Sequence, residues 1–192
     1  MILTSSTPPL FPEYLPVIHP FTAALQARDH AALVETLADD VVLHSAVTSA
    51  LFEGKETVAD LYAAVLDSFQ HVEVIDEFES GDTHAFFWRG RIEGRFVEGS
   101  DRFRLDAEGR VREITIVGRP LSGLATFLTG IGYRFARRRR GRAIAVALRL
   151  PTLPLPPLFA LMDPLSRWLA RPRGARRRAS SAPLERPRRD RP

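Results

Sequence analysis

The sequence contains no cysteine, which excludes disulfide bonds, thiolate nucleophiles and cysteine-ligated zinc. Lysine occurs once, at Lys55, and every other basic residue is an arginine. The 5 histidines do not have the spacing that is typical of metal ligands; they are His19, His30, His44, His71 and His84. We therefore predict neither a metal ion nor a cofactor.

Long hydrophobic runs are also absent. The longest uncharged apolar stretch of the C-terminal part, Leu150–Met162, contains prolines and is shorter than the roughly 18 residues that a membrane-spanning helix needs. Residues 1–12 have neither the basic residue nor the clean apolar run of a signal peptide. We expect no transmembrane helix, a disordered lead-in over residues 1–12, and a cytoplasmic location.

The charges of the chain are divided between its two parts. Residues 1–118 carry 9 basic and 20 acidic residues, whereas residues 119–192 carry 18 basic and 3 acidic residues. The division predicts an acidic folded domain followed by a basic appendage. The expected segments are a lead-in at 1–12, the domain at 13–118, an apolar and basic, partly helical extension at 119–170, and a disordered tail rich in arginine and proline at 171–192.

Two apolar periodicities divide the domain into helices and strands. Spacing of three and four residues predicts helices, and the clearest one has an apolar stripe from Val58 to Phe69. Alternation predicts strands, above all His84–Val97, and points Phe78, Phe96 and Asp101 inward. The expected order is a helix within 14–27, a helix at 30–38 capped by Asp29 and ended by Asp39-Asp40, a strand at 41–45, a loop at 52–54, a helix at 58–69, and antiparallel strands at 71–80, 84–97, 101–106 and 111–118, with a turn at Gly99-Ser100. This order predicts an α+β fold.

Three stretches carry a family resemblance, and they occur in the order "LADDVVLHS", "FEGKETVADLYAAVL" and "GSDRFRLDAEGRVREITIV". Over about residues 13–118 they resemble the nuclear transport factor 2-like superfamily, in particular its SnoaL-like and ketosteroid-isomerase-like bacterial members. The resemblance implies a curved antiparallel sheet wrapped around N-terminal helices, with a cone-shaped cavity that is open at one end.

The resemblance also assigns candidate catalytic residues. In the ketosteroid isomerases a strand carboxylate moves a proton, and a tyrosine and a protonated aspartate stabilise the oxyanion. The resemblance puts Ser45 at the position of the base and Phe21 at that of the tyrosine, so both groups are missing. Asp101 matches the aspartate, and Tyr62 matches a helix tyrosine that points into the cavity. His44 is next to the base position and faces inward only if a bulge rotates it. The candidates are therefore Asp101, His44 and Tyr62.

The inward apolar surface is interpreted both as core and as the lining of a cavity. The leading hypothesis is that the domain binds a small apolar molecule without the full isomerase set. Two alternatives stay open: an isomerase-, cyclase- or dehydratase-like enzyme that uses Asp101 with His44 or Tyr62, and a homodimeric interaction module. The predicted ligand-binding residues are Phe21, Leu43, Ser45, Tyr62, Leu66, Phe86, Trp88, Phe103, Ile114 and Ile116.

The extension has apolar residues at helical spacing over Leu121–Phe135, then a basic run at Arg137–Arg140 and Arg142. We expect a short helix near 143–150, no helix in the proline-rich stretch 151–157, and a further apolar segment at 158–170. Its role stays open between packing on the domain or a partner subunit and peripheral attachment to an anionic membrane surface. Nucleic-acid binding is disfavoured, because no aromatic residues alternate with the arginines.

Overall fold

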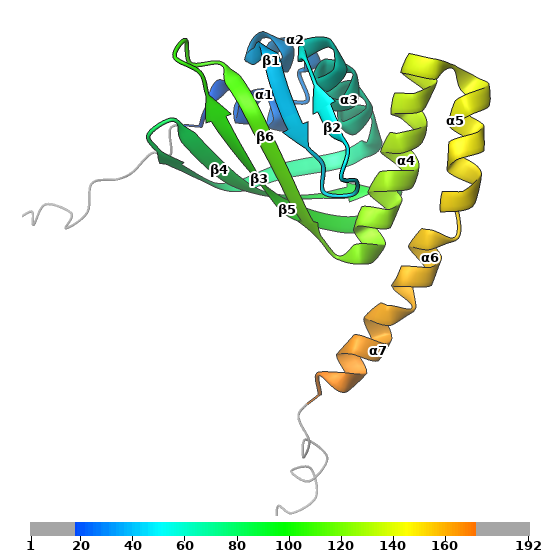
Figure 1. The fold of residues 1–192 in the computed structure, drawn as a ribbon. Helices are drawn as coiled ribbons and strands as arrows, with labels where there is room; N and C mark the ends of the chain where they lie inside the picture. The colour runs from blue at the N-terminus through cyan, green and yellow to red at the C-terminus, as the bar shows by residue number, and fades with distance from the viewer. Residues whose placement is uncertain (1–17, 172–192) are drawn as a thin grey trace, which may run out of the picture.

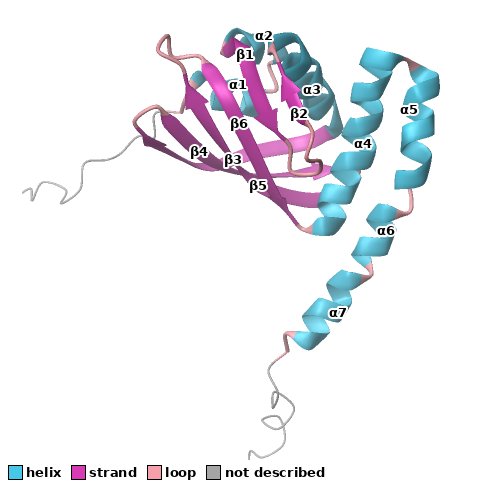
Figure 2. Cartoon of the chain, viewed as in Figure 1, coloured by secondary structure: helices cyan, strands magenta, loops and turns pink. Residues whose placement is uncertain are grey.

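The computed structural model describes residues 18–171 and contains one six-stranded sheet, shown in Figures 1 and 2. The predicted lead-in at 1–12 and the predicted tail beyond residue 171 lie outside the described residues. In chain order the elements are α1 (Pro20–Ala27), α2 (His30–Glu35), β1 (Leu37–His44), β2 (Leu51–Glu53), α3 (Lys55–Ser68), β3 (Phe69–Ser80), β4 (Thr83–Ile92), β5 (Arg95–Leu105), β6 (Val111–Arg119), α4 (Leu121–Arg140), α5 (Arg142–Arg149), the 3-10 helix η1 (Leu150–Thr152), α6 (Leu155–Ala160) and α7 (Met162–Leu169).

The sheet curves around the three N-terminal helices, as Figure 2 shows, and its strand order is β2-β1-β6-β5-β4-β3. Strands β3 to β6 form an antiparallel meander, and β1 pairs in parallel with β6, so that Leu43 lies opposite Ile114. The predicted α+β class, with a curved sheet wrapped around N-terminal helices, is confirmed, and the sheet is not closed. The sheet is mixed and not wholly antiparallel, because the meander brings β6 back beside β1 through a long connection, which allows parallel pairing.

Local capping starts the first two helices. The His19 side chain accepts the backbone N–H of Phe21 in the first turn of α1, and Asp29 accepts that of Ala32 in α2, at 3.1 and 3.0 Å. The predicted end of the second helix is wrong. Helix α2 stops at Glu35, and Asp39-Asp40 are exposed residues within β1. The prediction failed because two successive polar residues occur both at the end of a helix and at an exposed part of a strand.

A bulge changes which side chains of β3 face inward. The pairing of β3 with β4 shifts between Val74 and Asp76, and a one-residue shift turns every later side chain to the other face. The side chain of Glu77 is therefore only 3 % exposed. The prediction for Phe78 is wrong, since this side chain is 58 % exposed.

The predicted long strand 84–97 is instead a hairpin. Strand β4 ends at Ile92, and Glu93 and Gly94 form the turn with φ angles of 49° and 76°. The turn restarts the alternation, so that Val97 is buried and Phe96 is exposed, contrary to the prediction. Gly99-Ser100, predicted as a turn, lie inside β5.

The core lies between α1, α3 and the concave face of the sheet. Phe21 is at its centre, with ring centroids 5.5 Å from Tyr62, 6.3 Å from Phe86 and 5.1 Å from Phe103. The apolar stripe of the helix predicted at 58–69 is buried along α3, as its spacing requires. These aromatic rings fill the space between α1, α3 and the sheet.

Helix α4 packs on the domain and spans both the predicted apolar helix and the basic run. It contacts α3 and the strands β4, β5 and β6. Phe127 and Ile131 belong to the buried core cluster, and the ring of Phe135 lies 5.5 Å from that of Phe52. At its basic end, Arg138 donates to Asp67 and Arg139 to Asp60, both on α3, at 2.8 and 2.9 Å.

Helices α5 to α7 continue outside the sheet. In Figure 1, α5 runs back alongside α4, and α6 and α7 lead away from the domain. Helix α6 begins within the proline-rich stretch predicted to be non-helical, because prolines are tolerated in the first turn of a helix. The segment Arg142–Ser166, with a mean hydropathy of 1.6, is long and apolar enough to cross a membrane by those two criteria alone. This segment is longer than the uncharged stretch Leu150–Met162, on which the expectation of no transmembrane helix rests.

Candidate functional site

An apolar cavity of about 80 Å³ lies between α3, the β1 side of the sheet and α4. Its wall is almost entirely hydrocarbon, and the only side chains in it that carry a polar atom are Ser45, Thr48 and Tyr62. The lining residues are Leu43, Ser45, Val47, Thr48, Phe52, Leu61, Tyr62, Val65, Ile116, Phe127, Leu128, Ile131, Gly132 and Phe135. This set contains no aspartate, glutamate or histidine.

Helix α4 closes one side of the cavity, and sequence reasoning did not include it in the site. Phe127, Leu128, Ile131 and Phe135 contribute side chains, and Gly132 leaves space beside them, since a Cβ there would meet no atom within 4 Å. The helical spacing of these apolar residues was visible in the sequence. The surface that they cover was not, because it depends on contacts with segments more than 60 residues earlier, such as Phe52.

The polar residue deepest in the wall is Tyr62. Its hydroxyl is buried and has no hydrogen-bond partner among the described residues. Burial raises the pKa of Tyr62 well above its usual value, and the charge of nearby Asp101 raises it further, so the hydroxyl stays protonated. An unpartnered O–H beside an apolar cavity is available to a polar atom of a ligand.

Asp101 lies behind Tyr62, on β5, and points inward as predicted. The indole Nε1–H of Trp88 donates to its Oδ1 at 2.7 Å, and both side chains are buried. Burial raises the pKa of Asp101 to about 7, and the Trp88 hydrogen bond opposes this shift only in part. A substantial fraction of the carboxyl is therefore neutral near pH 7.

The residues predicted to bind a ligand fall into two groups. Leu43, Ser45, Tyr62 and Ile116 line the cavity. The other six are buried in the core next to it and do not line it: Phe21, Leu66, Phe86, Trp88, Phe103 and Ile114.

His44 lies on the opposite face of β1 from the cavity-lining Leu43 and Ser45. Its side chain is exposed, and its Nε2 is 4.0 Å from Oε1 of Glu113. No bulge rotates it inward, so the structure brings Asp101 and Tyr62 together but not His44.

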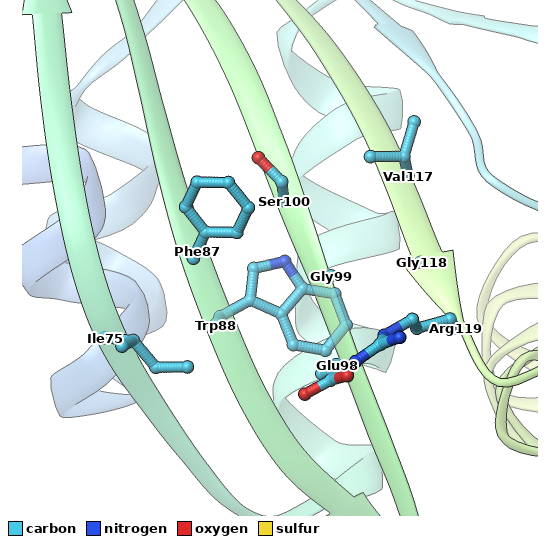
Figure 3. A pocket seen from close by; sticks show the side chains of 9 residues that line it. All are labelled: Ile75, Phe87, Trp88, Glu98, Gly99, Ser100, Val117, Gly118 and Arg119. Carbon is cyan, nitrogen blue, oxygen red and sulfur yellow. Dashed lines mark hydrogen bonds and ion pairs between the residues drawn. The ribbon is translucent and has the colours of Figure 1, made fainter.

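A second, open hollow of about 440 Å³ is shown in Figure 3. Ile75, Phe87 and Val117 contribute partly exposed apolar side chains to it. The ring of Trp88 shows at its floor because Gly99 has no side chain. A Cβ at Gly99 would lie 2.3 Å from the carbonyl oxygen of Val117 and 2.7 Å from the Trp88 ring.

A separate polar cluster joins α1 to β3 and β4. The backbone N–H of His19 donates to Glu77, and Nδ1 of His84 is 3.4 Å from Glu77 Oε1 without hydrogen-bond alignment. Burial and the proximity of His84 lower the pKa of His19 to about 4. None of these residues lines the cavity, and within residues 18–171 no group of three or more histidine and carboxylate side chains is arranged to hold a metal ion.

Comparison with known proteins agrees with the fold. A steroid delta-isomerase from Pseudomonas aeruginosa is 25% identical, with a TM-score of 0.54, over 65% of this chain and 88% of its own. An uncharacterized bacterial protein with a cystatin-like fold from Silicibacter pomeroyi is 19% identical, with a TM-score of 0.58, over 71% of this chain and 96% of its own. No curated protein matches the sequence significantly. The family model of the SnoaL-like domain matches residues 18–114, which is half of the chain, and this match confirms the resemblance. The protein therefore belongs to the SnoaL-like domain family, in the nuclear transport factor 2-like fold.

Proposed function

We propose that this SnoaL-like domain binds a small apolar molecule in the cavity beneath α4. The observation that carries the proposal is an apolar lining with one unpartnered buried hydroxyl, that of Tyr62. Apolar pockets with few convergent polar groups are the usual form of small-molecule sites. The absence of a carboxylate or imidazole from the lining favours binding over proton transfer.

The size of the cavity limits the ligand. An engineered apolar cavity of about 150 Å³ holds benzene, and the cavity here measures about 80 Å³. A single ring or the end of an alkyl chain therefore fits with slight adjustment, whereas a polycyclic ligand requires α4 to move outward. A ligand hydroxyl or carbonyl near Tyr62 would satisfy the free O–H.

The test is a titration of the full-length protein with phenol and toluene, followed by NMR. These probes have nearly the same shape, and phenol has a hydroxyl where toluene has a methyl group. Tyr62→Phe is therefore expected to weaken the binding of phenol roughly fivefold to tenfold and to leave the binding of toluene unchanged. Gly132→Leu fills the cavity from α4 and is expected to abolish binding of both probes. Gly132→Ala adds one methyl group and is the matched control. Absence of binding by the unmodified protein, or equal binding after Gly132→Leu, would overturn the proposal.

A second candidate function is an isomerase-like enzyme, which the neutral fraction of the buried Asp101 carboxyl favours. The steroid delta-isomerase similarity supports the same class of reaction, a shift of a double bond next to a carbonyl group. In this candidate the hydroxyl of Tyr62, supported by neutral Asp101, donates to the developing enolate oxygen. Ser45 cannot act as the base, so a solvent molecule would carry the proton between carbons.

The assay for this candidate is ultraviolet absorbance as a β,γ-unsaturated cyclic ketone becomes conjugated. Tyr62→Phe and Asp101→Asn are expected to lower the rate, with Asp101→Asn also removing the decline in rate above about pH 7. Turnover that is unaffected by both variants, or indistinguishable from buffer, rejects the enzyme and leaves the binding function standing.

A further inference from the structure

The largest feature that the proposed function leaves unexplained is the apolar surface of the C-terminal helices. Among residues 18–171, more large apolar side chains are exposed between residues 144 and 169 than in all the rest. Soluble monomers rarely expose so large a contiguous apolar patch. The exposed side chains, which we call the apolar face, are Ile144, Val146, Leu148, Leu150, Leu153, Leu158, Leu161, Met162, Leu165, Trp168 and Leu169.

Contacts on the other side attach this segment to α4. Ala145 and Pro156 are buried, and Thr129 Oγ1 donates to the carbonyl oxygen of Thr152 at 3.3 Å. The guanidinium of Arg149 lies 5.1 Å from the ring centroid of Tyr133. The segment is therefore held against the domain by one side, and the apolar face is left open.

The charges next to the apolar face indicate what covers it. Three arginines at the corner between α4 and α5 form no ion pair with any other described residue: Arg137, Arg140 and Arg142. Their neighbours Arg138 and Arg139 do form ion pairs, with α3. The sequence after residue 171 is basic as well, with arginine far in excess of acidic residues. An apolar surface flanked by free arginines is complementary to anionic headgroups above acyl chains.

The attachment of this segment to α4 decides between spanning a bilayer and lying on it. By length and hydropathy alone Arg142–Ser166 could span, and the residues between its helices keep helical backbone angles. A span would, however, bring the charge of Arg149 into the hydrocarbon region and would break the hydrogen bond from Thr129 to the carbonyl oxygen of Thr152. Arg149 is also held on Tyr133 of α4, which keeps α5 beside the domain.

We propose that residues 142–169 bind the surface of a bilayer that contains anionic lipids. The apolar face inserts at the boundary between headgroups and acyl chains, and Arg137, Arg140 and Arg142 contact the headgroups. Trp168 lies at this boundary, where its ring is half immersed. The proposal does not depend on the cavity having a ligand.

The test is co-sedimentation of the full-length protein with phosphatidylcholine vesicles, with and without phosphatidylserine. Binding is expected only with phosphatidylserine and is expected to weaken steeply as salt is raised. The emission of Trp168 is expected to shift to the blue on binding, and Trp168→Phe removes this shift while the protein still sediments. The second tryptophan, Trp88, is already buried and does not contribute to the shift.

Paired variants separate the apolar and the charged contributions. Leu161→Asp with Leu165→Asp changes two side chains that are exposed in the free protein, and is expected to weaken vesicle binding at least tenfold. The matched control is Leu51→Asp with Phe78→Asp, comparably exposed side chains on the sheet. This control leaves vesicle binding unchanged.

Replacing the three free arginines by glutamine tests the charged contribution. At about 1 kcal/mol for each basic residue near the surface, the loss of three is expected to weaken binding to phosphatidylserine vesicles roughly a hundredfold. The control replaces three exposed arginines of the sheet with glutamine, so that the net charge is equal: Arg91, Arg104 and Arg112.

Three results would overturn the proposal. The first is absence of binding by the unmodified protein, and the second is equal binding to neutral and anionic vesicles. The third is a dimer, detected by analytical ultracentrifugation without lipid, that Leu161→Asp with Leu165→Asp dissociates while no variant changes sedimentation with vesicles. That result would assign the apolar face to a second copy of the chain.

Discussion

Asp101→Asn gives the most direct access to the electrostatics of the buried site. Asparagine keeps the shape of the side chain and an oxygen to accept the hydrogen bond of Trp88, but it cannot ionise. The change therefore removes a single titration from the core. Its effect on stability measures how strongly the folded protein favours the neutral carboxyl.

The expected size follows from the pKa of Asp101, about 7 in the folded protein, against about 3.9 in an unfolded chain. Between these values the folded state holds a proton that the unfolded state has lost, so the stability of the unmodified protein falls as pH rises. The favourable contribution of the neutral Asp101 carboxyl to stability is complete below about pH 3.9, decreases as the pH rises, and is lost above about pH 7. Between pH 5 and pH 8 the loss is roughly 2 to 3 kcal/mol. The stability of Asp101→Asn relative to the unmodified protein should rise by this amount.

The assay is urea unfolding of both full-length proteins at several pH values from 5 to 8, with the difference in unfolding free energy plotted against pH. Asp106→Asn is a control with a pKa shift of opposite sign. Partial burial would raise the pKa of Asp106, but hydrogen bonds from Arg110 outweigh it and the pKa is lowered. The loss of stability in this variant should therefore be constant from pH 5 to 8, because a lowered pKa changes the unfolding free energy only below the unfolded-state value of about 3.9. A flat difference for Asp101→Asn would show that Asp101 titrates normally, and would remove the neutral carboxyl from the enzymatic candidate.

Two further substitutions test packing at the same site. Gly99→Ala should destabilise the protein by about 1 to 3 kcal/mol, because its Cβ would meet the Val117 carbonyl oxygen and displace the Trp88 ring. Urea unfolding measures the loss of stability, and near-ultraviolet circular dichroism measures the displacement of the ring. A variant with unchanged stability and spectrum would contradict the close packing. Tyr62→Phe should stabilise the ligand-free protein by about 1 kcal/mol, since it removes a buried hydroxyl without a partner. A loss of stability would mean that the hydroxyl has a partner, such as an ordered water molecule.

The fold was predictable where one periodicity persisted over many residues. The apolar stripe of α3 and the alternation from His84 to Ile92 each specify one buried face. The prediction failed where the backbone changed phase. The bulge near Val74 inserts a residue into β3, and the turn at Glu93-Gly94 redirects the chain. Neither feature has a strong sequence signal. At the turn, glutamate is an unusual residue for a positive φ angle.

The candidate site was predictable only in part, for a different reason. Strand alternation predicted the inward direction of Asp101, and the superfamily resemblance predicted that of Tyr62. It gave nothing about α4, which lies outside the matched residues 18–114. The apolar spacing of α4 showed that it packs on something, but a helix of this kind fits a core, a partner or a membrane equally well by sequence.

The opposite charges of the two parts of the chain explain little of how α4 is held. Arg138 and Arg139 pair with Asp67 and Asp60, but these side chains are all about one third exposed or more. Exposed pairs of this kind contribute about 0 to 1 kcal/mol each and are screened by salt. Burial of Phe127 and Ile131 contributes more, at about 1.5 to 3 kcal/mol for each fully buried side chain. The apolar contacts therefore keep α4 on the domain, and the ion pairs fix its direction. Because the free arginines are not needed for this packing, they remain available at the corner where α5 begins.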